Sequence, residues 1–82
     1  MAAKQKLVEV KPFEMIPEVP QAFDQAAVVN IEALKAIDYW REMKDRAWTS
    51  DQQAYAHKKL VAWQQVNRKA EAVMQSYQLR LI

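Results

Sequence analysis

The chain contains no glycine, and its three prolines all lie within residues 12–20. Glycine normally supplies tight turns between strands, left-handed helix ends and phosphate-binding loops. Its absence disfavours a β-rich fold and excludes the glycine-rich phosphate motifs. Neither glycine nor proline, the two residues that break helices, occurs after Pro20. We therefore expect an all-α fold.

The length and composition limit the number of domains, the kinds of site and the cellular location that we expect. A chain of 82 residues is expected to form one domain. It has no cysteine, so disulfides and cysteine-bound zinc are excluded, and its net charge of +2 is too small to assign a nucleic-acid or membrane partner. It shows no apolar core of a secretory signal and no run of 18 apolar residues. We therefore expect no membrane span, no secretion by a signal peptide, and a location in the cytoplasm or within a large intracellular or viral assembly.

The first expected helix runs from about residue 20 to about residue 48. Its apolar residues recur at alternating spacings of three and four, which is typical of a helix that packs along one seam. The members of this seam are Ala26, Val29, Ala33, Ala36, Trp40, Met43 and Ala47. Pro20 is expected in the first turn, where its missing N–H costs nothing.

A second apolar row lies beside that seam, formed by Phe23, Ala27, Ile31, Leu34 and Ile37. At 100° per residue the two rows together cover roughly 200° of the helix surface. One partner helix buries only about half of that width. We therefore expect something else to cover the second row.

The second expected helix runs from about residue 50 to about residue 80. Thr49 or Ser50 is the expected N-cap, with Gln52 or Gln53 as its capping-box partner. The apolar stripe again shows spacings of three and four, at Ala56, Leu60, Trp63, Val66, Ala70, Val73, Tyr77 and Leu81. Because the connection is short, the two helices should pack antiparallel.

Residues 1–19 are expected to form an extended arm, and residues 20–82 the helical hairpin. Lys11, Ile16 and Val19 each precede a proline, which disfavours helical backbone at these positions. The apolar residues of the arm still need burial. Two alternatives stay open: the arm folds back and covers Phe23, Ile31 and Leu34, or it reaches a partner protein by a strand-like or groove contact.

Two groups of polar residues suggest chemistry but fit a structural role better. Asp38, Glu42 and Asp45 share part of a helix face, yet basic residues interleave with them at ion-pair spacing. His57 is the only histidine and has no nucleophile or carboxylate at catalytic spacing. We therefore expect no catalytic residue, no metal and no cofactor.

The aromatic residues divide by position. Trp40 and Trp63 fall on the two seams and are expected in the core. Trp48 at the turn and Tyr39 on the polar face are the better candidates for an exposed contact, because aromatic residues anchor interfaces.

The basic residues favour an alternative function. From Thr49 to the end there are five basic and two acidic residues, a local charge of +3. Lys58, Lys69 and Arg80 recur every eleven residues and share one helix face, about 16 Å apart. That spacing is sparse for a phosphate backbone, so a solvated face is the simpler interpretation.

The sequence as a whole predicts an antiparallel two-helix hairpin with an extended, proline-containing N-terminal arm. We expect a non-enzymatic accessory subunit that docks into a larger assembly, such as a virion, or a homo-oligomer. The expected contact residues are Leu7, Val10, Phe13, Met15, Ile16, Val19, Phe23, Ile31, Leu34, Trp48 and Leu81. The alternatives are a nucleic-acid-binding or regulatory protein that uses Lys58, Lys69 and Arg80, and an inhibitor of a larger enzyme.

Overall fold

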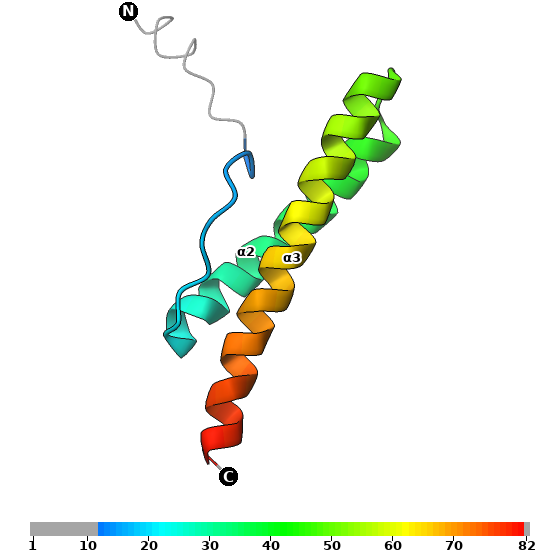
Figure 1. Ribbon diagram of the computed structural model, residues 1–82. Coiled ribbons are helices and arrows are strands. Elements are labelled where there is room, and N and C mark those ends of the chain that lie inside the picture. Colours follow the sequence, from blue (N-terminus) through cyan, green and yellow to red (C-terminus); the bar gives the residue numbers. More distant parts are fainter. Residues whose placement is uncertain (1–11, 82) are drawn as a thin grey trace, which may run out of the picture.

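The chain folds into two long helices joined by a short turn (Figure 1). The structure, a computed structural model, describes residues 12–81, with side chains described through residue 78. Helix α2 spans Phe23–Asp45 and helix α3 spans Ser50–Leu81. Within this part of the chain there is no strand, so the predicted all-α hairpin is confirmed. Residues 12–22 of the arm run beside the hairpin, and residues 1–11 lie outside the described part.

Helix α2 starts later than predicted, so Pro20 lies outside its first turn. The N-cap residue is Ala22, whose backbone is extended at φ −85° and ψ 137°. The carbonyl of Gln21 accepts a hydrogen bond from the Tyr77 hydroxyl at 2.8 Å, and not the helical bond from the Gln25 N–H. That N–H donates to the Asp24 carboxylate at 2.9 Å. The helical ladder therefore begins with the bond from the Ala26 N–H to the Ala22 carbonyl, at 2.8 Å.

The turn contains the predicted cap. The Gln52 N–H donates to Thr49 Oγ1 at 3.1 Å, and Gln52 Oε1 accepts the Trp48 N–H at 3.0 Å. Thr49 is thus the N-cap of α3, and Gln52 differs from a capping-box partner by accepting the N–H of the residue before the N-cap. Because the Trp48 N–H bonds to Gln52 and the Ala47 N–H bonds to the Lys44 carbonyl three residues back at 3.3 Å, α2 does not continue to residue 48. It ends at Asp45, and the Arg46 N–H bonds to the carbonyl of Glu42 at 3.0 Å.

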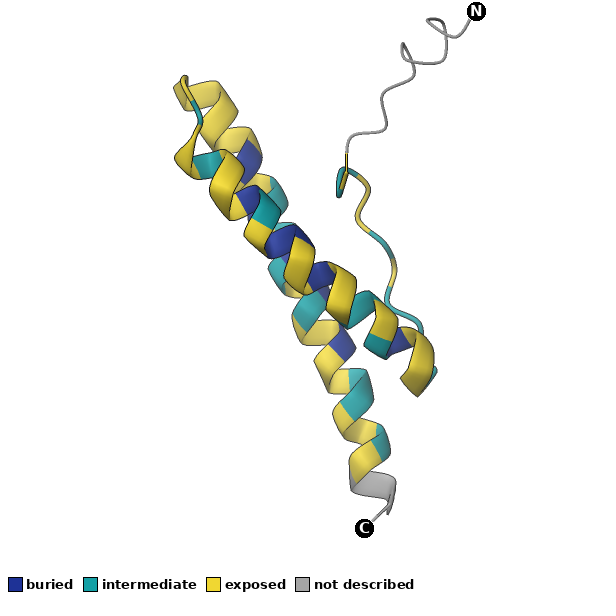
Figure 2. Ribbon diagram, turned by 180° about the vertical axis from the view of Figure 1, so that it is seen from behind, coloured by how far each residue is buried: buried dark blue, intermediate teal, exposed yellow. Residues whose placement is uncertain are grey.

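The core lies along the two predicted seams. Its buried residues are Ala26, Ala33, Ala36, Ile37 and Trp40 of α2, and Ala56, Leu60, Trp63, Val66 and Ala70 of α3. In Figure 2 the buried positions (dark blue) follow the line where the helices meet, and the outer sides are exposed. The small side chains of α2 let the larger ones of α3 approach closely, which permits dense packing. Met43 is a departure from the prediction, being 40% exposed near the end of α2.

No helix in the described part of the chain combines the length and apolarity that crossing a membrane requires.

Candidate protein interface

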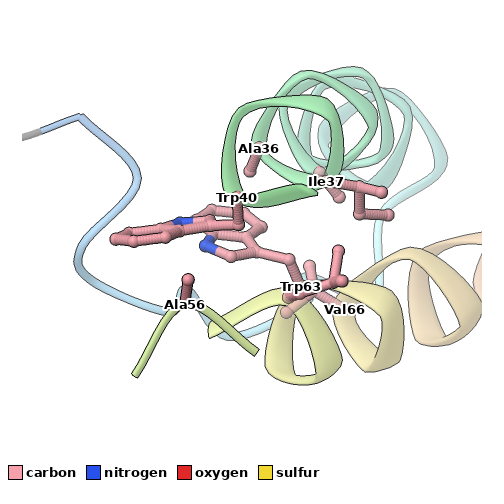
Figure 3. Close-up of a cluster of buried hydrophobic side chains, with 8 residues drawn as sticks. Ala36, Ile37, Trp40, Ala56, Trp63 and Val66 are labelled. Carbon is pink, nitrogen blue, oxygen red and sulfur yellow. The ribbon is translucent and has the colours of Figure 1, made fainter. Parts of the chain in front are cut away.

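The backbone carbonyl of Phe13 accepts hydrogen bonds from two tryptophans of the core. Nε1–H of Trp40 and Nε1–H of Trp63 each donate to this oxygen at 2.9 Å. The indoles come from α2 and α3 and reach into the same space between the helices (Figure 3). They are only 3% and 1% exposed, and a buried donor without an acceptor costs about 1–3 kcal/mol. One atom of the arm therefore satisfies the only polar group of each core tryptophan.

Phe13 adopts a left-handed backbone to present that carbonyl. Its φ is 60°, a region that costs a residue with a side chain about 1–2 kcal/mol. Its ring offsets this cost by packing against Tyr39 at a centroid distance of 5.5 Å and against Trp63 at 5.9 Å. Both arrangements are tilted or edge-on, as aromatic pairs prefer. Tyr39, which we expected to be an exposed contact, is half-buried as a result.

Glu14 fixes the arm on the α3 side. The ammonium of Lys59 donates to the Glu14 carbonyl at 2.6 Å and lies 3.6 Å from the Glu14 carboxylate, with both side chains about three-quarters buried. The Tyr55 hydroxyl donates to the same carboxylate. This hydrogen bond, with smaller contributions from desolvation and from the negative charge of Glu14, raises the pKa of Tyr55 above 10.0. The arm thus makes polar contacts to both helices within two consecutive residues.

The remaining arm residues divide between packed and exposed. Val19, like Phe13, packs against the core as a half-buried side chain. Met15 is 87% exposed and Ile16 is 41% exposed. Ile16 and Val19 line a groove of about 620 Å³ whose other wall is α3, including Val66. The backbone and aromatic ring at residue 13 are therefore engaged within the chain, and Met15 points outward.

Of the two alternatives for the arm, residues 12–22 do not adopt the one that covers Phe23, Ile31 and Leu34 of the second apolar row. Ile31 is 55% exposed and Leu34 is 50% exposed. Phe23 is 39% exposed and packs its ring on Tyr77 of α3 at 5.9 Å. The physical reason is the pair of indole donors, which hold Phe13 at the groove between the helices, so that its side chain borders Val28 and Ile31 without covering them.

Val28 extends the uncovered row, because it is 66% exposed on the same side of α2. We call Val28, Ile31 and Leu34 the outer face of α2. Ile31 lies two residues before the buried Ala33, which at 100° per residue places it on the opposite side of the helix from the core. Single exposed apolar residues are ordinary, but a contiguous group of large ones marks an interaction surface.

A second exposed apolar group lies at the tip of the hairpin. Trp48 is 93% exposed in the turn, as predicted for an aromatic residue at that place. It borders a groove of about 610 Å³ that also includes Met43, Tyr55 and, from the arm, Glu14. Trp48 is therefore an accessible aromatic side chain in the turn that follows α2, away from the outer face.

The basic residues of α3 stay dispersed. Lys58 and Lys69 are exposed, and the side chain of Arg80 lies outside the described part. The ammonium of a third lysine, Lys59, is hydrogen-bonded to Glu14. The described side chains therefore place two solvated lysines eleven residues apart on a helix. The predicted contact residues Leu7 and Val10, and the side chain of Leu81, are likewise outside the described part.

The acidic residues of α2 form surface ion pairs. Asp38 lies 3.8 Å from Arg41, and Glu42 lies 3.6 Å from Arg46, with all four side chains more than half exposed. Among the described residues, no group of three histidine, cysteine or acidic side chains could hold a metal ion. His57 is exposed, and its Nδ1 lies 3.0 Å from the ammonium of Lys44.

The polar contacts that hold the arm are not among the features predicted from the sequence. Glu14, Tyr55 and Lys59 form a polar cluster with bonds across more than 40 residues of sequence, and none of the three was predicted to be a site residue. One signal for such contacts is present in the sequence. Two tryptophans on facing seams carry N–H groups that must find acceptors when buried, and two all-apolar seams contain none.

No known protein family model, no curated protein and no solved structure matches this chain.

Proposed function

We propose that this protein is a non-enzymatic docking subunit that binds a partner through the outer face of α2. The observation that carries the proposal is the uncovered row of Val28, Ile31 and Leu34, each at least half exposed beside a hairpin that has its own complete core. Fully burying a side chain of this kind contributes about 1.5–3 kcal/mol. A partner that covers the three would gain much of that free energy.

The arm has a different role in this proposal. It binds at the groove between the helices through Phe13 and leaves Val28, Ile31 and Leu34 at least half exposed. The partner then binds the outer face of α2, as in helix-in-groove recognition. Trp48 supplies a second contact at the hairpin tip, because a fully accessible tryptophan is a frequent anchor of interfaces.

The test is site-specific photo-crosslinking in the cells that make the protein. A photoreactive amino acid replaces Val28, and a matched variant carries it at Lys58, an exposed position of α3 that also reports on the alternative basic surface. We expect a discrete protein adduct from position 28 and none from position 58. Adding Ile31→Lys to the variant that carries the photoreactive group at position 28 should remove most of that adduct.

The Ile31→Lys change is suitable because the side chain is already half exposed, so folding should change by no more than about 0.5 kcal/mol. Circular dichroism of the purified variant checks this. Equal adducts from positions 28 and 58, or an adduct that survives Ile31→Lys in a folded protein, would contradict docking through the outer face.

A further inference from the structure

Four residues of α2 form one line along its outer side. Asp24, Val28, Ile31 and Lys35 follow at spacings of four, three and four, so they share a helix face like the seam of a coiled coil. All four are exposed. Within the described part of the chain neither Asp24 nor Lys35 forms an ion pair, although Asp24 accepts the N–H of Gln25. The line thus has an acidic end, an apolar middle and a basic end.

This order makes the line complementary to itself in the antiparallel sense. We propose that the outer face of α2 docks against the same face of a second copy of this chain. A two-fold axis between residues 29 and 30 places Val28 opposite Ile31 of the second copy. The same axis places Asp24 opposite Lys35 of the second copy, and each contact occurs twice by symmetry.

Other arrangements of the two helices bring like charges together. A parallel pair places Asp24 against Asp24 and Lys35 against Lys35. Moving the antiparallel axis onto Ile31 places Asp24 opposite Asp38 of the second copy. Charge complementarity therefore favours the register about residues 29 and 30 over these two arrangements, in the way that charged positions select partners in coiled coils.

The surroundings of the line also suit a helix partner. Phe13 of the arm and Glu32 of α2 border a hollow of about 400 Å³ that includes Val28, Ile31 and Lys35. Leu34 flanks the other side and is half exposed. The overlapping helix segments are roughly 20 Å long at 1.5 Å per residue, which is shorter than a standard interface requires. We therefore expect a weak dimer that forms only at high chain concentrations.

This inference rests on the proposed function, since it names the partner of the same face. Analytical ultracentrifugation of the full chain from about 10 to 500 µM at low salt tests it, starting from a monomer mass of 9.6 kDa. We expect a concentration-dependent monomer–dimer equilibrium. Asp24→Lys and Lys35→Asp should each weaken it about tenfold, because each change turns two attractive pairs into repulsive ones.

Rescue by mixing two variants is the decisive experiment. An equimolar mixture of Asp24→Lys and Lys35→Asp restores both attractive pairs, and so does the double variant, so each should dimerise like the unchanged protein. Asp51→Lys is the matched control, because it removes an exposed first-turn acid from α3 as Asp24→Lys does from α2. It should leave the dimer unchanged, and circular dichroism should show that every variant keeps its helices.

A chain that stays monomeric at 500 µM overturns the inference, as does a dimer that ignores the charge reversals or is not rescued by mixing. The crosslinking test separates this failure from that of the proposed function. A position-28 adduct with a different protein, together with a monomeric chain, leaves docking through the outer face in place and removes only the second copy as its occupant. Failure of both measurements removes both.

Discussion

The left-handed backbone of Phe13 predicts which of two variants, Phe13→Gly or Phe13→Ala, is the more stable. Phe13→Gly and Phe13→Ala both delete the aromatic ring, so both lose the contacts with Tyr39 and Trp63. They differ in how each tolerates φ 60° and in how much freedom each gives the unfolded chain. Glycine enters that region without steric cost, whereas alanine does not.

The magnitude follows from two opposing terms. Relief of the left-handed backbone favours glycine by about 1–2 kcal/mol. The greater freedom of glycine in the unfolded chain offsets about 0.5–1 kcal/mol of that. We therefore expect Phe13→Gly to be more stable than Phe13→Ala by roughly 0.5–1 kcal/mol. At an ordinary extended or helical position the order would be reversed by a similar amount.

The assay is urea unfolding followed by circular dichroism, with both variants measured beside the unchanged protein. Loss of the half-buried ring should lower the unfolding free energy of both by about 2 kcal/mol, within a total of roughly 4–12 kcal/mol for a chain of this length. Phe13→Ala equal to or more stable than Phe13→Gly would refute the described conformation of the arm.

Three further predictions concern the core, the cap and the pH dependence. Trp63→Phe removes one indole donor and part of a buried ring, so it should lower the unfolding free energy by about 2–3 kcal/mol. Trp48→Phe at the exposed turn is its control and should change that free energy by less than about 0.5 kcal/mol; equal effects in urea unfolding would contradict the burial assignment. Thr49→Ala should cost about 1 kcal/mol of unfolding free energy because it removes the N-cap oxygen of α3, and a similar loss in the same assay for Ser50→Ala would place the cap elsewhere. Because the folded-state pKa of Tyr55 is raised above 10.0, its bond to Glu14 stabilises the protein fully below that pH and loses its effect as pH rises through the folded pKa. The unfolding free energy of the unchanged protein should therefore exceed that of Tyr55→Phe by a constant amount below pH 10.0, and this difference should shrink above it. A difference that grows with pH in urea unfolding would contradict this assignment.

The sequence predicted the seams of the hairpin well. Spacing alone placed Ala33 and Trp40 on the seam of α2 and Leu60 and Trp63 on the stripe of α3, and all four are buried. This succeeds because the helical period is fixed by backbone geometry and the absence of glycine left no competing turn. Thr49 was recognisable for the same reason, since capping depends on residue type and local spacing.

The seating of the arm could not be read from the sequence. The contact of Phe13 with Trp40 and Trp63 depends on a backbone carbonyl, which every residue has, and on a left-handed φ that phenylalanine rarely adopts. The apolar pattern alone left open whether the arm covers the outer row of α2 or reaches a partner protein. The two indole donors instead favour the groove, because hydrogen-bond satisfaction in the core outweighs additional apolar contact outside it.

Docking through the outer face of α2 depends most directly on the arm being held by its own hairpin, which leaves that face for a partner. The chain has three tryptophans, so a ¹⁵N–¹H spectrum of the isolated protein resolves three indole N–H signals. We predict that the signals of Trp40 and Trp63 exchange slowly with solvent and that the signal of Trp48 exchanges fast. Fast exchange at all three would contradict this seating of the arm, because the arm would then be free to carry the docking contact itself.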